Sequence, residues 1–146
     1  MKNIRVENAD WALHKEGLIA LRTEVFVEEQ NVPPSLEIDG LDTECLHVRA
    51  MVGDEVIGTG RLLPNGYIGR MCVDKNYRDS GIGRLLLNNL VNQAIEAQYP
   101  MIALNSQVYA IPFYEKCGFV VDSDEFMDAG IPHRRMTLDR DRFKSI

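Results

Sequence analysis

Two glycines one residue apart, Gly81 and Gly83, stand directly before a run of residues with a helical apolar period. The apolar positions form one row of Ile82, Leu86 and Leu90 and an adjacent row of Leu87, Val91 and Ile95. This spacing predicts an amphipathic helix from residue 82 to about residue 98. The glycines let the backbone adopt dihedrals that other residues avoid, and they leave no side chain in front of the first N–H groups of the helix.

The first N–H groups of a helix have no intrahelical partner, so we expect them to bind an anion here. Each would contribute about 1.5–3 kcal/mol to the binding of a charged acceptor, and the helix dipole about 0.3–1 kcal/mol more. Arg78 and Arg84 flank the glycines and could reach the rim of the same site. The chemistry fits a phosphate or a pyrophosphate. A glycine-rich turn that binds nothing is the alternative for a bare Gly-x-Gly.

The neighbouring residues exclude two familiar phosphate-binding motifs. A Walker loop needs Gly-Lys-Ser or Gly-Lys-Thr, and neither follows these glycines. A dinucleotide fingerprint needs a third glycine where Leu86 stands and an acidic residue near Asn105, and both are missing. The earlier Gly58-Thr59-Gly60 falls within a predicted strand, and we interpret it as structural.

The rest of the chain predicts an α+β domain with a mixed sheet. A strand over residues 3–8 precedes a helix from Asp10 to about Glu29, with a buried stripe of Leu13, Leu18, Leu21 and Val25. The segment 31–44, with its two prolines and several carboxylates, is expected to be a long surface loop. Strands over 45–52, 55–63 and 67–73 predict an antiparallel meander. A strand over 101–106, a short helix over 109–117 closed by Gly118, and strands over 119–123 and 133–138 complete the list.

Composition narrows the class of protein. The 146 residues fit one domain over 1–146, and a net charge of −6 argues against nucleic-acid binding. The apolar stretches are too short to span a membrane, and no secretory leader is visible. The chain has an odd number of cysteines, Cys45, Cys72 and Cys117. We expect these cysteines to be reduced and buried, which fits a cytoplasmic protein. No second ligand pair accompanies Cys45 and His47, so no metal is expected, and His47 is interpreted as a strand residue satisfied by a neighbour.

Two longer stretches resemble signatures of one superfamily. Residues 72–91, CVDKNYRDSGIGRLLLNNLV, resemble the acyl-CoA-binding motif of the GNAT N-acetyltransferases, and residues 105–120, NSQVYAIPFYEKCGFV, resemble their second signature. Residues 21–42 and 126–136 further resemble the ElaA/YjcF-like branch. The resemblance spans nearly the whole chain. It implies the GNAT fold, acetyl-CoA as co-substrate, and a small-molecule or peptide amine as acceptor; dimers are frequent among similar proteins.

The resemblance also implies where the cofactor binds. The pyrophosphate of coenzyme A would contact Arg78, Asp79, Ser80, Gly81, Ile82, Gly83 and Arg84. The pantetheine arm would pair like an extra strand with Met71, Cys72 and Val73, where a backbone N–H would polarise the thioester carbonyl. Gln107 stands seven residues before Tyr114, where many relatives have an asparagine that holds the arm. The slot for the pantetheine arm would open where the strand over residues 67–73 diverges from the strand over residues 101–106.

Tyr114 occupies the position of the general acid in the family, which protonates the departing thiolate. The alternative for Tyr114 is an aromatic anchor of a short helix.

Cys72 suggests a second hypothesis, in which its thiol carries the acyl group. No His or Asp at motif spacing would activate the thiol, so a buried strand cysteine is the simpler interpretation.

An alkylammonium acceptor also needs a base, because its deprotonation near pH 7 costs about 4–5 kcal/mol. The candidates are Glu28, Glu29, Glu37, Asp39, Asp42 and His133, and the sequence does not choose among them. Loop carboxylates are usually solvated and inert.

The function that the resemblance implies is acetyl transfer from acetyl-CoA to a primary amine by direct attack in a ternary complex. A non-catalytic acyl-CoA sensor is the main alternative, and a nucleotide-binding regulator is a weaker one.

Overall fold

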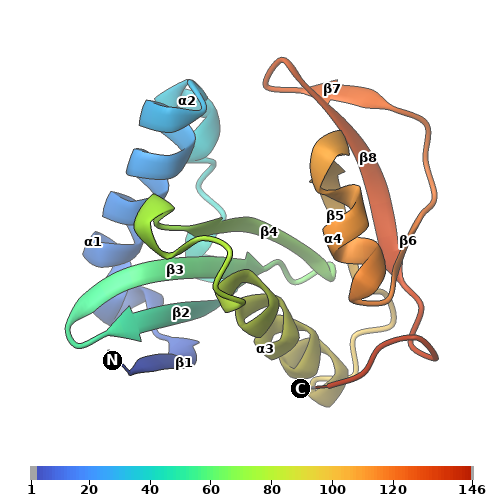
Figure 1. Cartoon of the computed structure of the whole chain (residues 1–146), viewed down its shortest axis with the longest axis horizontal. Helices are drawn as coiled ribbons and strands as arrows, with labels where there is room; N and C mark the ends of the chain where they lie inside the picture. The colour runs from blue at the N-terminus through green and yellow to red at the C-terminus, as the bar shows by residue number, and fades with distance from the viewer. Residues whose placement is uncertain (1–2, 146) are drawn as a thin grey trace.

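The computed structural model describes residues 3–145, which form helices on both faces of one mixed sheet (Figure 1). The helices are α1 (Trp11–Arg22), which continues as a π-helix (Thr23–Glu29), α2 (Pro34–Glu37), α3 (Ile82–Glu96) and α4 (Ile111–Lys116). The strands are β1 (Ile4–Ala9), β2 (Leu46–Val52), β3 (Glu55–Leu62), β4 (Tyr67–Val73), β5 (Ala103–Gln107), β6 (Phe119–Val121), β7 (Phe126–Asp128) and β8 (Ile131–Leu138). The predicted α+β class is confirmed.

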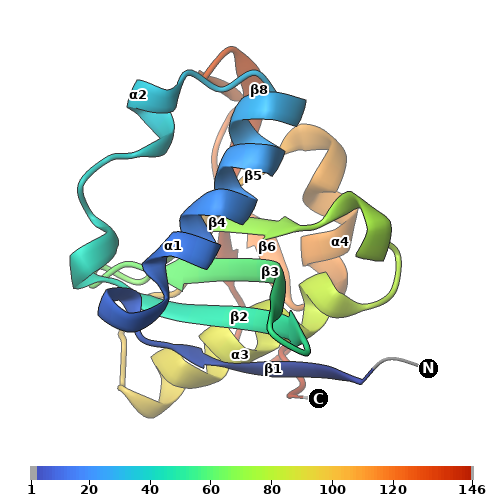
Figure 2. The ribbon, with the colours of Figure 1, turned by 90° about the vertical axis from the view of Figure 1, so that its left-hand side faces the viewer.

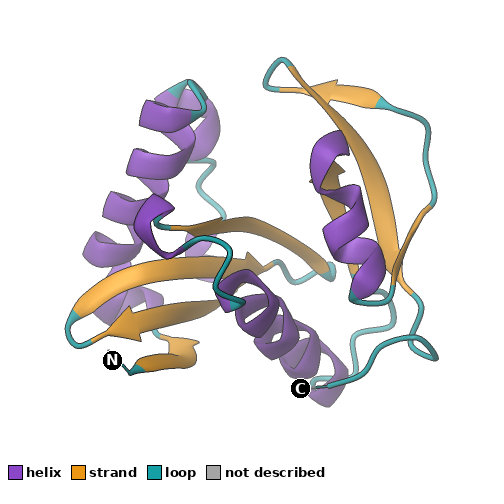
Figure 3. Cartoon of the chain, viewed as in Figure 1, coloured by secondary structure: helices purple, strands orange, loops and turns teal. Residues whose placement is uncertain are grey.

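The sheet has the order β1-β2-β3-β4-β5-β8-β6, with β7 paired to β8 (Figure 3). Strands β1 to β4 are antiparallel, as the predicted meander requires. Strands β4 and β5 are parallel but pair only at Tyr67 with Ala103 and at Ile68 with Leu104. Beyond these two pairs they separate, so the sheet divides into a β1–β4 half and a half made of β5, β8, β6 and β7.

Helices α1 and α3 cover opposite faces of the β1–β4 half (Figure 2). Helix α3 lies close to β3 because Gly58 and Gly60 have no side chains there. A Cβ on Gly58 would stand 2.9 Å from Leu86 Cδ1, and a Cβ on Gly60 would stand 2.9 Å from Leu90 Cδ1. The structural role predicted for this glycine pair is therefore confirmed.

Two details of the predicted helices need correction. Leu13 is 77% exposed, whereas Leu18, Leu21 and Val25 are buried. Leu13 precedes Leu18 by five positions, which places it roughly 140° around the helix from the buried stripe. The predicted stripe was therefore too wide. In α3 the two predicted rows are buried except at their end, where Ile95 is 37% exposed.

The segment 31–44 also differs from the solvated loop that was expected. It contains α2 and a 3₁₀ turn (Asp42–Glu44), and the side chains of Glu37 and Asp42 are buried. Arg22, at 1% exposure, donates from Nε to Glu37 Oε1 at 2.6 Å and from Nη1 to Asp42 Oδ1 at 2.7 Å. This pairing could not be predicted from the sequence, because the partners lie 15 and 20 residues apart.

Further contacts extend these pairs into an ion-pair network, defined here as Arg22, Arg61 and Arg70 with Glu37, Asp39 and Asp42. Arg61 on β3 bonds the carboxylates of Asp39 and Asp42. Arg70 on β4 donates to the carbonyl of Glu37 at 3.0 Å. His47 Nε2 bonds the Asp42 carbonyl oxygen at 2.8 Å, so this histidine is satisfied as predicted. The network fastens segment 31–44 to α1, β3 and β4.

The ion-pair network predicts a strong effect of Arg22→Met on stability. The variant leaves Glu37 and Asp42 buried without their cation, so we expect unfolding to need about 3–5 kcal/mol less free energy in urea titrations. Arg5→Met is the control, because the pair of Arg5 with Glu7 is exposed and should contribute less than about 1 kcal/mol. Equal stability of the two variants would contradict a structural role for the network.

Candidate active site

The glycine turn before α3 leaves backbone donors open. Gly81 caps the helix with φ +86°, a left-handed conformation that disfavours residues with a side chain. The first intrahelical bond runs from the Leu85 N–H to the Gly81 carbonyl at 3.2 Å. Within residues 3–145, the N–H groups of Ile82, Gly83 and Arg84 have no recorded acceptor. Three neighbouring donors at the positive end of a helix can therefore receive an anion.

The side chains around this turn have separate positions. Arg78 donates from Nε to the Val73 carbonyl at 2.9 Å and from Nη2 to both carboxylate oxygens of Glu29 at 2.8 and 3.0 Å. Arg78 thus ties the turn to the end of the first helix. The Ser80 hydroxyl bonds the Tyr77 carbonyl. Asp79 and Arg84 are exposed, and Asp79 has φ +61°.

A cleft of about 390 Å³ lies where β4 and β5 separate. A bulge in β4 shapes its wall, because the register passes from Arg61 opposite Gly69 to Thr59 opposite Cys72. Within this bulge Arg70 has φ +51°. The Asp74 N–H donates to the Ile57 carbonyl on β3 at 2.8 Å, and strand alternation then points the Val73 N–H away from β3, toward the open side. Met71 lines the cleft directly.

Cys72 faces the interior instead of the cleft. It is buried with Leu21 and Val25, and burial raises the pKa of its thiol to about 12. A thiol with this pKa is protonated near neutral pH and is a poor nucleophile. The free cysteines Cys45 and Cys117 are only half-buried, so the expectation that all three are buried was wrong for these two.

Tyr114 lies on α4 and lines the cleft. Its ring contacts Phe113 and Phe119 edge-on, with centroid distances of 5.0 and 6.2 Å. Burial raises the pKa of the phenol to about 12, so the hydroxyl is protonated at physiological pH. Its hydroxyl has no recorded hydrogen-bond partner among the described residues. Gln107, also in the cleft, donates from Nε2 to Gln30 Oε1 at 3.2 Å.

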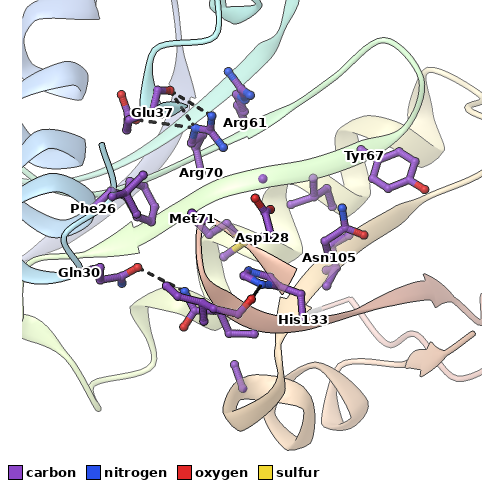
Figure 4. Close-up of a pocket in the computed structure, with 18 of the residues that line it drawn as sticks. Phe26, Gln30, Glu37, Arg61, Tyr67, Arg70, Met71, Asn105, Asp128 and His133 are labelled. Carbon is purple, nitrogen blue, oxygen red and sulfur yellow. Dashed lines mark hydrogen bonds and ion pairs between the residues drawn. The ribbon is translucent and has the colours of Figure 1, made fainter. Parts of the chain in front are cut away.

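The six candidate bases do not come together. Glu28 is exposed outside the cleft, and Glu29 is paired with Arg78. Asp42 is buried against Arg22; burial alone would raise its pKa, but bonds from Arg22 and Arg61 lower it. A hydrogen bond from Arg61 likewise holds the pKa of Asp39 well below its usual range. Glu37 and His133 remain on the cleft wall (Figure 4), and an ion pair with Arg22 holds the carboxylate of Glu37.

Asp128, which also lines the cleft, was not among the site residues predicted from the sequence. It ends β7, a three-residue strand joined to β8 by a turn at Ala129 and Gly130, both with positive φ. The usual signal for such a hairpin is Asn-Gly or Asp-Gly, and Ala-Gly is weaker. The alternation of Phe126, Asp128, Ile131 and His133 was the remaining indication.

The part of the chain that the structure describes holds no group of three or more His, Cys, Asp or Glu side chains able to bind a metal ion. Within the same residues, none of the helices has the length and apolarity that crossing a bilayer requires.

Comparisons with known proteins agree with one another. Residues 11–140 match the profile of the acetyltransferase (GNAT) domain. The Bacillus subtilis protein YjcF, an uncharacterized N-acetyltransferase, is 42% identical over 123 residues, which cover 82% of this chain and 88% of YjcF. Escherichia coli ElaA has a similar crystal structure, with a TM-score of 0.84 at 25% identity over 94% of this chain and 100% of ElaA. A Bacillus anthracis protein crystallised with acetyl coenzyme A has a TM-score of 0.57 at 30% identity, covering 65% of this chain and 62% of its own.

Proposed function

The chain belongs to the GNAT acetyltransferase family, in its ElaA/YjcF-like branch, and from this premise we propose that it acetylates a primary amine by direct attack in a ternary complex. Family membership makes it an acyltransferase that takes its acetyl group from acetyl-CoA. The amine acceptor and the direct attack are the proposal. The observation that supports it most is the cleft between β4 and β5, which holds Tyr114.

We expect coenzyme A to bind across two elements. Its pyrophosphate accepts hydrogen bonds from the unpaired N–H groups of Ile82, Gly83 and Arg84. The pantetheine arm then runs along the open edge of β4, where Met71 and Val73 offer backbone groups that β5 does not use. Gln107 faces the arm from β5 with an amide that can exchange its bond to Gln30 for one to the pantetheine.

The chemistry follows from this placement. The Val73 N–H donates to the thioester oxygen as negative charge develops there. Tyr114, protonated because its pKa is about 12, donates to the departing sulfur. Cys72 takes no part, since a buried thiol with a pKa of about 12 offers almost no thiolate near pH 7. An acyl group therefore passes from sulfur to the amine without resting on the protein.

One prediction of the proposed function concerns Tyr114. Tyr114→Phe keeps the aromatic contacts but removes the proton donor, so we expect kcat to fall by about 10²-fold or more with little change in the KM for acetyl-CoA. Thiol release over a panel of amines measures both constants. Tyr99→Phe, outside the cleft, is the control.

Undiminished turnover by Tyr114→Phe would refute its role as acid. Wild-type protein that binds acetyl-CoA but releases no thiol with any amine would instead support the sensor alternative.

Another prediction of the proposed function concerns the anion site. Gly83→Asp places a carboxylate over the donor N–H groups. An acidic side chain in the first turn interacts favourably with the helix dipole. The added Cβ would lie 3.7 Å from Phe113, which is an ordinary van der Waals contact. The fold should persist, and calorimetric titration with coenzyme A should show at least tenfold weaker binding, because the loss of one charge-assisted bond costs about 1.5–3 kcal/mol.

Ala12→Asp is the matched control for Gly83→Asp, since it adds the same charge to the first turn of α1. Equal coenzyme A affinity in both variants would show that the pyrophosphate binds elsewhere.

A further inference from the structure

We propose that His133 is the general base of the reaction and that Asp128 binds the acceptor as an ammonium ion. This inference rests on the proposed function, and it adds the charge of the acceptor and the route of its proton. Both residues line the cleft that contains Tyr114 (Figure 4).

The β7–β8 hairpin places the two side chains on one face. Its register sets Phe126 opposite His133 and Asp128 opposite Ile131. Residues directly opposite each other share a face, and side chains alternate along a strand, so Asp128 and His133 are diagonal neighbours on the same side. Figure 4 draws both side chains pointing into the cleft from this hairpin.

The next strand places His133 close to the cofactor arm. In the β5–β8 pairing His133 stands directly opposite Gln107, so their side chains also share a face. Gln107 is the residue that we expect to contact the pantetheine. A base at His133 therefore lies beside the part of the cleft where the thioester would end.

A hydrogen bond fixes the tautomer of His133. Its Nδ1 lies 2.7 Å from the Ile131 carbonyl oxygen, which can only accept, so Nδ1 carries the hydrogen. The neutral ring then has its lone pair on Nε2, and Nε2 has no recorded partner within the described residues. Phe126 stacks on the ring with a centroid distance of 6.0 Å and an interplanar angle of 22°. His133 is 9% exposed, so the ring is held in place with its accepting nitrogen unused.

The charges around the cleft leave Asp128 as the carboxylate available to a cation. Across from His133, Glu37 is paired with Arg22, and Arg61 and Arg70 are bonded to Asp39. Tyr109 and Tyr114 face the cleft from the segment after β5. Among the described residues Asp128 has no recorded ion pair or hydrogen bond and is exposed. An incoming ammonium ion thus meets one unneutralised carboxylate, next to the free nitrogen of His133.

The proton balance of the step is complete. His133 Nε2 takes one proton from the ammonium group, and the amine nitrogen attacks the thioester carbonyl carbon. The C–N bond forms, and the C–S bond breaks as Tyr114 gives its proton to sulfur. The nitrogen then passes its surplus proton to the Tyr114 oxygen, and His133 releases its proton to water. The products are the N-acetylated amine, coenzyme A and one proton.

The test varies the basicity of the acceptor. With an alkylamine found in the panel, His133→Gln should lower kcat/KM by about 10²–10⁴-fold. Fluorinated analogues of that amine have lower pKa values and need less help to lose a proton, so the loss should shrink steadily along the series. His14→Gln, on α1 outside the cleft, is the control.

A merely structural role for His133 would lower the rate equally for all analogues. That result, with acetyl-CoA affinity and melting temperature unchanged, would overturn the base assignment.

Asp128→Asn should raise the KM of the amine about tenfold or more with a small change in kcat, whereas Asp124→Asn should not. An unchanged KM in Asp128→Asn would overturn the ammonium site. Wild-type protein that acetylates no amine would overturn the proposed function and this inference together.

Discussion

The whole site depends on backbone hydrogen bonds that two neighbouring strands do not make. Strands β4 and β5 are parallel neighbours that pair at two positions and then separate. Each backbone group past that point needs another partner, because an unpaired N–H or C=O in a protein interior is costly. A ligand with amide groups, such as pantetheine, can supply those partners. The separation thus creates both the space and the recognition chemistry, and side chains on either half of the sheet refine it.

The two halves of the sheet contribute different functions to the proposed reaction. The β1–β4 half, with α3 on its face, provides the anion site and the bulged strand edge. The other half provides Tyr114 on α4 and the pair of Asp128 and His133 on the β7–β8 hairpin. In the proposed reaction one half of the sheet binds the cofactor, and the other half moves protons. In that reaction Val73 on β4 and Tyr114 on α4 act on the same thioester, although they lie far apart in the sequence.

The spacing of apolar residues and glycines in the sequence predicted three parts of the fold. The apolar rows of α3, the turn at Gly81 and the meander all follow from spacing between near neighbours. Asp42 and Glu37 could not be predicted as buried, because their burial depends on Arg22, which belongs to a different element. Asp128 was missed because a three-residue strand leaves almost no period to read. Choosing His133 among six candidate bases likewise required the cleft wall and the bond that fixes its ring.

The missing side chains of Gly58 and Gly60 have a consequence far from where they lie. They set how deeply α3 sinks onto β3, and the amino end of that helix is the expected anchor of the cofactor. A Cβ added at either glycine would stand 2.9 Å from a leucine Cδ1 of α3, so either that side chain or the helix would have to move. If the helix moved, the expected pyrophosphate site at its amino end and the open edge of β4 would no longer be spaced for the same molecule of coenzyme A. Gly58 and Gly60 thus set the spacing between α3 and β3. Substitutions there would displace the bound coenzyme A and leave the proposed catalytic side chains intact.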